Sequence, residues 1–379
     1  MSRAYQICIK CIMDTSDPEI VFDDVGVCNH CKEYEERARR ELHSGDLGEK
    51  ELDKIVTDIK KKGGGREYDC IVGLSGGVDS TLVAYKVKQL GLRPLAVHLD
   101  NGWDSELSIA NIEHIVKKLD FDLQTYVVDW QEFRDIQVAF FRSSISNIEI
   151  PTDHAIWAMI VHVAIERGIK YFISGHNLAT EGVLPRSWGY DPFDLKFIQA
   201  IHRRFGKLPM RTFPQLELLP RIYYIYLQNL KSIRLLDYQE YNRNEAKGFL
   251  EKEIGWRDYG GKHFESVFTR FFQGYILPKK FGIDKRRAHF SALVCSGQMT
   301  RDAALEAIRC DPYPDVEMMH SDKEYVIKKL GLNAEEFEDI MAAPVKNFRE
   351  YPNDHALQQF MRTIYRSAVN IREILLPKD

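Results

Sequence analysis

Long apolar runs are missing from this 379-residue chain, and no window approaches the roughly 20 apolar residues that a membrane-spanning helix needs. We also expect no signal peptide, since MSRAYQICIKC has no apolar core of adequate length. Excess positive charge is also absent, because 52 lysines and arginines face 56 aspartates and glutamates. That balance argues against a general nucleic-acid-binding protein, whose surface is usually basic. We therefore expect a cytoplasmic protein with neither a membrane nor nucleic acid as its partner.

Cysteine is scarce, and four of the seven cysteines stand in two pairs near the start of the chain. In a reducing compartment they are expected to be thiols or metal ligands rather than disulfides. The spacing Cys8-x2-Cys11-x16-Cys28-x2-Cys31 fits a pattern typical of zinc sites. Four thiolates would fill a tetrahedral Zn²⁺ and leave no open position, so this metal would be structural. A redox dithiol and an iron–sulfur cluster are the alternatives.

Glycines and changes in hydrophobic period divide the chain into three parts. Residues 1–62 hold the zinc-binding lobe and a charged connecting helix, and three glycines follow. Residues 63–240 alternate short apolar runs with helical periodicity, which predicts an α/β fold with a doubly wound parallel sheet. Residues 241–379 show helical patterns with little strand signal and predict a helical domain. The expected strands are short and buried, and they cover residues 70–74, 94–99, 123–128 and 170–174.

The most informative motif is DCIVGLSGGVDST (69–81), where an apolar run ends in Ser-Gly-Gly and a helical pattern begins. Glycines let the backbone approach a ligand, and successive N–H groups before a helix N-terminus bind anions. The motif lacks the lysine of G-x-x-x-x-G-K-[ST] and is not G-x-G-x-x-G. A plain strand-to-helix turn is the alternative explanation. The predicted phosphate-binding residues are Leu74, Ser75, Gly76, Gly77, Asp79, Ser80 and Thr81.

SGGVDS resembles the SGGxDS loop of the PP-loop ATP pyrophosphatases, which include asparagine, GMP and NAD synthetases and tRNA thiolases. The resemblance implies a HUP-like sheet, cleavage of ATP to AMP and pyrophosphate, and a Mg²⁺ cofactor that neutralises charge. In that superfamily the loop holds the leaving pyrophosphate while AMP passes to a substrate oxygen. A nucleophile then displaces AMP.

Polar residues at two other strand ends are expected to reach the same ATP site. HLDNGWD (98–104) follows the second strand and SGHNLATEG (174–182) follows the fourth. Asp79 and Glu181 are the candidate Mg²⁺ ligands, although Asp79 could equally be a first-turn helix acid. Ordinary loop polarity is the alternative for each residue of these loops. The further candidate ATP contacts are His98, Asp100, Asn101, Gly175, His176, Asn177 and Glu181.

Segments along nearly the whole chain resemble N-acetyl sugar amidotransferases of bacterial surface-polysaccharide and flagellar-glycan pathways. This resemblance implies conversion of an N-acetyl group to an acetamidino group on a nucleotide-activated sugar. The nearest candidate is a UDP-linked diacetamido uronic acid of O-antigen, and the alternative is a nonulosonic acid of the pseudaminic or legionaminic branch. The resemblance also implies a separate glutaminase, like that of imidazole glycerol phosphate synthase, and a cyclase-like barrel partner that conducts ammonia. The segments are residues 8–31, SGGVDS, HLDNGWDSE, SGHNLATEG, and residues 255–291 and 296–305.

Several residues after the predicted strands are candidates for phosphate and proton chemistry. Lys262 and Lys285 are expected to contact pyrophosphate, and Arg286 suits phosphate because its fork binds bidentately. A solvated basic helix face is the alternative. In IPTDHAIWA (150–158), Thr152 or Asp153 is expected to cap a helix, with His154 at its start as a proton acceptor or as a core histidine. The candidate catalytic residues are Asp79, His154, Lys262 and Lys285.

Two other functions remain open at this stage. A tRNA thiolase of the PP-loop superfamily would need reactive cysteines near the loop and usually a basic surface. Cys70 lies inside a predicted strand and the net charge is -4, which disfavours this alternative. A non-catalytic subunit that binds zinc and ATP is the third hypothesis, and it predicts no AMP production.

Overall fold

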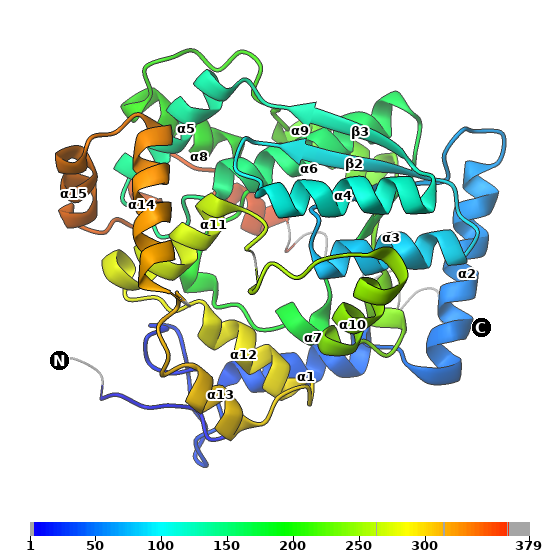
Figure 1. Cartoon of the computed structure of the whole chain (residues 1–379), viewed down its shortest axis with the longest axis horizontal. Helices are drawn as coiled ribbons and strands as arrows, with labels where there is room; N and C mark the ends of the chain where they lie inside the picture. Colours follow the sequence, from blue (N-terminus) through cyan, green and yellow to red (C-terminus); the bar gives the residue numbers. More distant parts are fainter. Residues whose placement is uncertain (1–3, 263, 314, 362, 364–379) are drawn as a thin grey trace.

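Five parallel strands form one sheet at the centre of the computed structural model, among the residues that it describes (4–262, 264–313, 315–361 and 363; Figure 1). The strand order is β3-β2-β1-β4-β5, and every neighbouring pair is parallel. The predicted α/β class with a parallel sheet is confirmed. The strands are Cys70–Gly73 (β1), Pro94–Asp100 (β2), Asp122–Val127 (β3), Tyr171–Ser174 (β4) and Lys231–Arg234 (β5).

The first four strands follow the predicted apolar runs to within one residue at each end. β3 is an edge strand whose side chains are mostly exposed, so the expectation that it is buried was wrong. β5 forms the opposite edge and was not predicted. Its sequence KSIR has no apolar run, because an edge strand needs little burial on either face.

Helices cover both faces of the sheet, as the doubly wound prediction required (Figure 1). Side chains of β1 alternate: Val72 packs with α2, α3, α4 and α10, whereas Ile71 packs with α5, α6 and α8. The α-helices are Asn29–Glu41 (α1), Gly45–Gly63 (α2), Val78–Gln89 (α3), Glu106–Leu119 (α4), Trp130–Arg142 (α5), Ile150–Glu166 (α6), Leu178–Glu181 (α7), Leu195–Phe205 (α8), Leu218–Ile222 (α9), Arg243–Ile254 (α10), Val267–Phe271 (α11), Arg286–Cys295 (α12), Arg301–Ala307 (α13), Val316–Leu330 (α14) and Ala334–Ala342 (α15). The 3₁₀ and π turns are Arg186–Trp188 (η1), Tyr223–Leu227 (η2), Leu235–Tyr238 (η3), Phe272–Phe281 (η4) and Phe348–Glu350 (η5).

The core extends across the expected boundaries of the three parts. One cluster of buried side chains includes Met13 of the cysteine-rich segment, Ile160 of α6 and Phe271 of α11. The cysteine-rich segment and α1 lie against α12 and α13 (Figure 1). Within the described ranges, no helix combines the length and the apolar character that crossing a bilayer requires.

Glu132 on α5 holds a surface loop through a buried carboxylate. Its Oε1 accepts hydrogen bonds from the backbone N–H groups of Arg211 (2.6 Å) and Phe213 (3.0 Å). Its Oε2 accepts one from the N–H of Thr212 at 2.9 Å. Burial disfavours the charged carboxylate, but these N–H groups outweigh that cost and lower the pKa of Glu132.

Replacing this charge tests the role of Glu132 in stability. A lowered pKa stabilises the fold above the unfolded value near 4.3, and the contribution is lost as pH falls through the folded value. Glu132→Gln should therefore lower the free energy of unfolding by about 2 kcal/mol at pH 7 and by less at pH 3. Urea unfolding at both pH values measures the difference, with exposed Glu33→Gln as the control. An equal loss at both pH values would contradict this account.

Candidate active site at the carboxyl edge of the sheet

The sheet changes winding direction between β1 and β4, and ligands of doubly wound sheets bind beyond the strand ends at such a point. The loops after these strands, residues 75–80 and 175–181, touch there. A Cβ built on Gly175 would lie only 2.9 Å from the backbone nitrogen of Ser80. Only glycine permits this approach without displacement of one loop. The structure therefore brings SGGVDS and SGHNLATE together, as their sequence positions suggested.

The SGGVDS loop is folded tightly around its glycines. Gly76 has a φ of +73°, and a Cβ on it would lie 2.5 Å from the carbonyl oxygen of Ser108. The Thr81 hydroxyl donates to the Gly77 carbonyl at 2.7 Å. α3 begins at Val78, and its N-cap residue Gly77 has no side chain to cap it; the Val78 backbone bonds to Tyr259 instead. This is the geometry of an anion-binding loop before a helix.

Three aromatic residues cover this loop, and the sequence reasoning missed all of them. Trp256 Nε1 donates to the Gly76 carbonyl at 2.8 Å, and Trp256 is only 1% exposed. The Tyr259 hydroxyl would lie 3.2 Å from a Cβ on Gly77. The Tyr241 hydroxyl donates to Asp79. The available signal was the GWRDYGG segment, where large aromatics stand beside a glycine pair.

Two acidic residues lie close together at the meeting point of the loops. Burial raises the pKa of Asp79; the charge of Lys262 opposes that effect, and the charge of Glu181 adds to it. Glu181 contacts His176 on one side and Lys262 Nζ, at 3.1 Å, on the other. The negative charges of the two neighbouring carboxylates repel each other. A divalent cation of the Mg²⁺ type would relieve that repulsion, so the pair fits such an ion.

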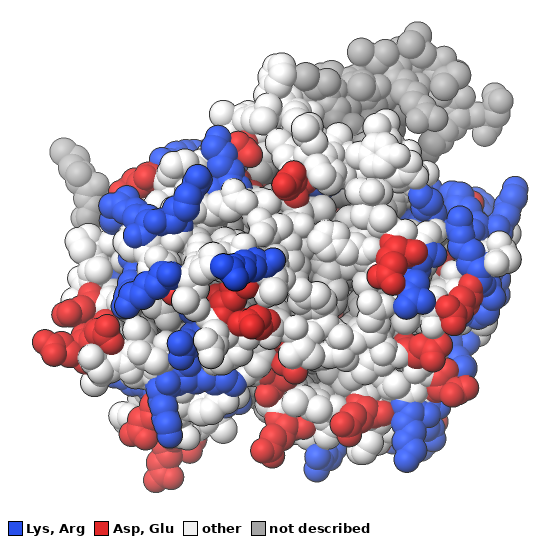
Figure 2. Space-filling view, turned by 90° about the horizontal axis from the view of Figure 1, so that it is seen from above, with Lys and Arg blue, Asp and Glu red and all other residues white. Residues whose placement is uncertain are grey.

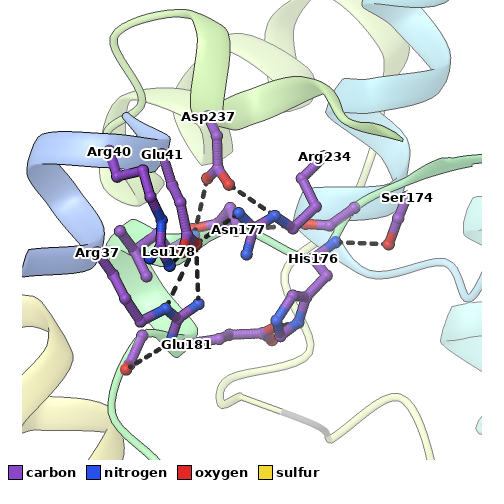
Figure 3. Close-up of polar contacts among 12 residues, drawn as sticks. Arg37, Arg40, Glu41, Ser174, His176, Asn177, Leu178, Glu181, Arg234 and Asp237 are labelled. Atoms are coloured by element: carbon purple, nitrogen blue, oxygen red, sulfur yellow. Dashed lines mark hydrogen bonds and ion pairs between the residues drawn. The ribbon is translucent and has the colours of Figure 1, made fainter. Parts of the chain in front are cut away.

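A polar network behind α7 fixes the loop that carries Glu181 (Figure 3). Asp237, just after β5, accepts the N–H of Leu178 at 2.8 Å and pairs with Arg234 at 2.9 Å. Arg234 in turn pairs with Glu41 of α1 at 2.7 Å. The Gly182 carbonyl at the end of α7 accepts from Arg37 at 3.2 Å. The loop is thus held by residues from α1 and from the unpredicted strand.

A cavity of about 650 Å³ opens beside these loops. It is bounded on one side by α7 and on the other by residues 260–290. Its cations suit a ligand with several negative charges. His263, next to Lys262, lies outside the described residues. The charged and histidine residues of the lining are Asp153, His176, Glu181, Arg243, Lys247, Lys262, Arg270, Lys285, Arg286, His289 and Asp311.

The structure does not place His154 in this cavity. α6 begins at Ile150 with Pro151 in its first turn, so neither Thr152 nor Asp153 caps it and His154 falls on the buried side. Its Nδ1 lies 2.7 Å from the Pro192 carbonyl, and its Nε2 accepts the N–H of Leu216 at 3.0 Å. Burial lowers the pKa of His154 to about 4. We conclude that His154 is a neutral core residue, contrary to the proton-handling prediction.

Arg286 lines the cavity, but its guanidinium is already occupied. It pairs with Asp284 at 2.7 Å and donates to the carbonyl groups of Cys310 (3.0 Å) and Asp311 (3.2 Å). These bonds tie the start of α12 to residues 308–311. Arg286 thus braces the cavity wall, and the prediction of a free phosphate fork was wrong.

The polar residues at the end of β2 and just after it form hydrogen bonds within the neighbouring loops and do not line the cavity. His98 Nδ1 lies 2.9 Å from the Leu74 carbonyl, and its Nε2 lies 3.2 Å from Asp104. Asp100 accepts the N–H of Gly102 at 2.8 Å, and Asn101 accepts that of Trp103 at 3.2 Å. None of these residues lines the described cavity. They hold the end of β1 and the β2 loop in place.

Asn177 has a similar structural role in the loop after β4. It is fully buried, and its Oδ1 accepts the N–H of Thr180 at 2.9 Å. This bond caps α7, so the Asn177 side chain is directed at the backbone.

The four paired cysteines converge on one point, as their spacing predicted. Their sulfur atoms lie within 4.8 Å of one another. The Sγ–Sγ distances are 3.6 Å for Cys11–Cys28, 3.7 Å for Cys28–Cys31 and 3.8 Å for Cys8–Cys31. A tetrahedron with about 2.3 Å metal–sulfur bonds has edges of about 3.8 Å. The donor set therefore fits one four-coordinate metal ion. Cys295 stands alone in the sequence, but its Sγ lies 3.9 Å from that of Cys31.

Arginines from the C-terminal helices donate hydrogen bonds to backbone carbonyl groups in the turn that carries the first cysteine pair. Arg301 of α13 donates to the carbonyl groups of Cys8 (2.9 Å) and Cys11 (3.0 Å). Arg287 of α12 donates to the Ile12 carbonyl at 2.8 Å. Because Lys285 and Arg286 stand at the start of α12, the metal centre and the cavity share this helix.

The C-terminal part has a recognisable family. Residues 265–365 match the family described as LPS biosynthesis protein WbpG-like, C-terminal domain. This segment is similar to the C-terminal domain of WbpG-like proteins. The match confirms the resemblance to surface-polysaccharide enzymes over these residues. No curated protein sequence matches the chain.

Solved structures resemble the chain at low identity. The U34-tRNA thiolase of Methanococcus maripaludis, with its 4Fe–4S cluster, is 13% identical over 91% of this chain and 98% of its own, with a TM-score of 0.33. The NH₃-dependent NAD synthetase of Campylobacter jejuni is 14% identical over 79% of this chain and 99% of its own, with a TM-score of 0.29. The NMN synthetase of Francisella tularensis is 14% identical over 59% and 92%, with a TM-score of 0.29. Likenesses this weak carry no argument about activity.

Removing one cysteine ligand tests the metal centre. Cys11→Ser should abolish metal retention and lower the unfolding temperature, because a structural site contributes on the order of 10 kcal/mol of binding free energy to the fold. Metal analysis of purified protein and thermal unfolding measure both effects. Exposed Cys310→Ser is the matched control and should change neither. Equal metal content in the two variants would contradict the four-cysteine site.

Proposed function

We propose that the protein is an ATP-dependent amidotransferase that converts an N-acetyl group of a nucleotide-activated sugar to an acetamidino group. The best candidate substrate is a UDP-linked diacetamido uronic acid of surface-polysaccharide biosynthesis. One observation carries the proposal. The WbpG-like segment supplies Arg270, Lys285 and Arg286 to the same cavity that is bounded by the loop after β4. The WbpG-like segment and the loop after β4 thus border one cavity, and the SGGVDS loop touches that second loop at Gly175.

The chemistry requires activation, because an amide carbonyl is a poor electrophile for ammonia. Transfer of AMP to the acetamido oxygen creates an imidate-like carbon, and ammonia then displaces AMP. The SGGVDS backbone and Lys262 would hold the leaving pyrophosphate. Asp79 and Glu181 would hold Mg²⁺, which supplies charge neutralisation for phosphate transfer. The cover formed by Trp256 and Tyr259 would exclude water, which otherwise hydrolyses the activated amide.

We assign zinc to the four-cysteine centre. The sulfur spacing supports a single ion, and four thiolates leave no open position for chemistry. In a four-iron cluster each thiolate binds a different iron, which would hold the sulfurs farther apart than the distances seen here. Zinc would then stabilise the lobe and, through Arg287 and Arg301, the position of α12.

Ammonia delivery is the part of the proposal that rests on the family resemblance. A separate glutaminase would release ammonia, and a cyclase-like barrel protein would conduct it to the cavity. The expected location is the cytoplasm, where ATP and nucleotide sugars are available.

A tRNA thiolase is the second candidate, because SGGVDS also resembles the loop of the PP-loop tRNA thiolases. Two observations disfavour it. Cys70 is fully buried in β1, and burial raises the pKa of its thiol, so it is a poor nucleophile. On the face shown in Figure 2, basic and acidic side chains are interspersed rather than gathered into a basic surface. A non-catalytic zinc- and ATP-binding subunit is the third candidate.

The proposal is tested by incubating the protein with ATP, Mg²⁺, ammonium and UDP-2,3-diacetamido uronic acid. We expect sugar-dependent AMP and pyrophosphate, together with a sugar mass that reflects replacement of O by NH. AMP without that mass change would support activation and point to a missing ammonia-delivery partner. No AMP with this sugar or with nonulosonic acid precursors would overturn the amidotransferase proposal. A parallel tRNA-binding titration against salt then tests the thiolase.

The contact between the two loops can be tested in the same assay. Gly175→Ala would push a Cβ against the Ser80 nitrogen and separate the loops. We expect sugar-dependent AMP formation to fall by about tenfold to 100-fold, because small displacements of a reacting group are costly. Gly248→Ala on α10 is the control, since its Cβ would meet nothing within 4 Å. Equal rates in both variants would show that the loops need not touch.

A further inference from the structure

Asp153 is the carboxylate of the cavity that has no polar partner. It stands in the first turn of α6, lines the cavity and is exposed to it. Among the described residues, no hydrogen bond or ion pair engages its side chain. The two other carboxylates of the lining are engaged: Glu181 pairs with Lys262 at 3.1 Å, and Asp311 accepts the N–H of Tyr313 at 2.9 Å. A carboxylate that has no polar partner, although lysines and arginines line the same cavity, is available to bind or to exchange a proton with a ligand.

The surroundings of Asp153 favour proton exchange near neutral pH. Although the side chain of Asp153 is accessible from the cavity, the protein packed around it disfavours the charged carboxylate. Together with the charge of Glu149, the residue before α6, this raises the pKa of Asp153 to about 7, against the opposing charge of Lys285. Glu149 is itself fixed, since it accepts hydrogen bonds from the hydroxyl of Thr269 and the amide of Gln273. A catalytic base works best when its pKa lies near the operating pH.

The proposed reaction creates a positive charge where the substrate had none. Ammonia that adds to the activated carbon carries three protons and must lose one before AMP departs. The product amidine is basic and takes up a proton to become a planar amidinium with N–H groups in a fork. Such a fork pairs with a carboxylate, as the arginine guanidinium does. Lysines and arginines in the cavity cannot meet either need.

We propose that Asp153 is the catalytic base that accepts a proton from the attacking ammonia and then pairs with the acetamidinium product. This inference rests on the proposed function and names the base for it. The C–N bond forms, and one proton passes from that nitrogen to an Asp153 oxygen. The C–O bond to AMP then breaks, and its electron pair leaves on the phosphate oxygen of AMP. Glu149 is a positioning residue, which acts through the charge it places beside Asp153.

The first experiment separates the two half-reactions with Asp153→Asn. ATP–pyrophosphate exchange that depends on the sugar reports activation, and the acetamidino sugar mass reports amination. We expect exchange to persist and amination by ammonia to slow by about 100-fold. Hydroxylamine should narrow this deficit, because its adduct loses a proton to water without help. Asp311→Asn, a partnered carboxylate of the same lining, is the control and should retain amination.

A second variant guards against a folding defect in the first. Glu149→Gln removes a negative charge beside Asp153, so the acid limb of the amination rate should move from near pH 7 to lower pH. An unmoved acid limb would overturn the assignment, and so would an Asp153→Asn variant that aminates at the wild-type rate. Failure of the proposed function looks different. In that case the wild-type protein shows no sugar-dependent exchange, and the inference falls with it.

Discussion

The close approach of two backbones at Gly175 and Ser80 is the constraint on which the site depends. β1 and β4 are neighbours from distant parts of the chain, and the sheet winds outward from them in both directions. Their loops can touch because no side chain stands between them. That contact sets the N-terminus of α3 beside α7, and so brings Asp79 within reach of the charges of Glu181 and Lys262. The chemistry of the site follows from this packing of main chain against main chain.

The lysine and arginine side chains of the cavity would repel one another if their charges were left uncompensated. The structure offsets that cost by pairing most of them with carboxylates of the protein. Among the described residues, Lys285 and Arg243 form no such ion pair, and the charge of Lys285 acts on the unengaged Asp153. These ion pairs offset much of the positive charge of the cavity, and Asp153 is left within electrostatic reach of Lys285. The compensating pairs are Lys247–Asp258, Lys262–Glu181, Arg270–Asp322 and Arg286–Asp284.

Local sequence patterns predicted those features that depend on residues close together in the sequence. The apolar runs located four strands, and the cysteine spacing located the metal centre, because both depend on short-range order. The partners of His154, by contrast, are Pro192 and Leu216, which no local pattern connects to it. Pro151 was a readable signal that α6 starts early, and it would have turned attention from His154 to Asp153. The covering role of Trp256 depends on a fold-level contact with Gly76 and has no counterpart in spacing.

The grip of Arg287 and Arg301 on the metal-binding turns has a practical meaning for anyone who handles this protein. The metal assigned to the four cysteines would take no part in bond making, yet it would help to hold in place the helix whose first residues line the cavity. Chelators carried through purification would thus act as slow inactivators, and the damage would be mistaken for a wrong substrate. The metal content of each preparation should therefore be measured, together with its protein concentration, before the preparation is assayed.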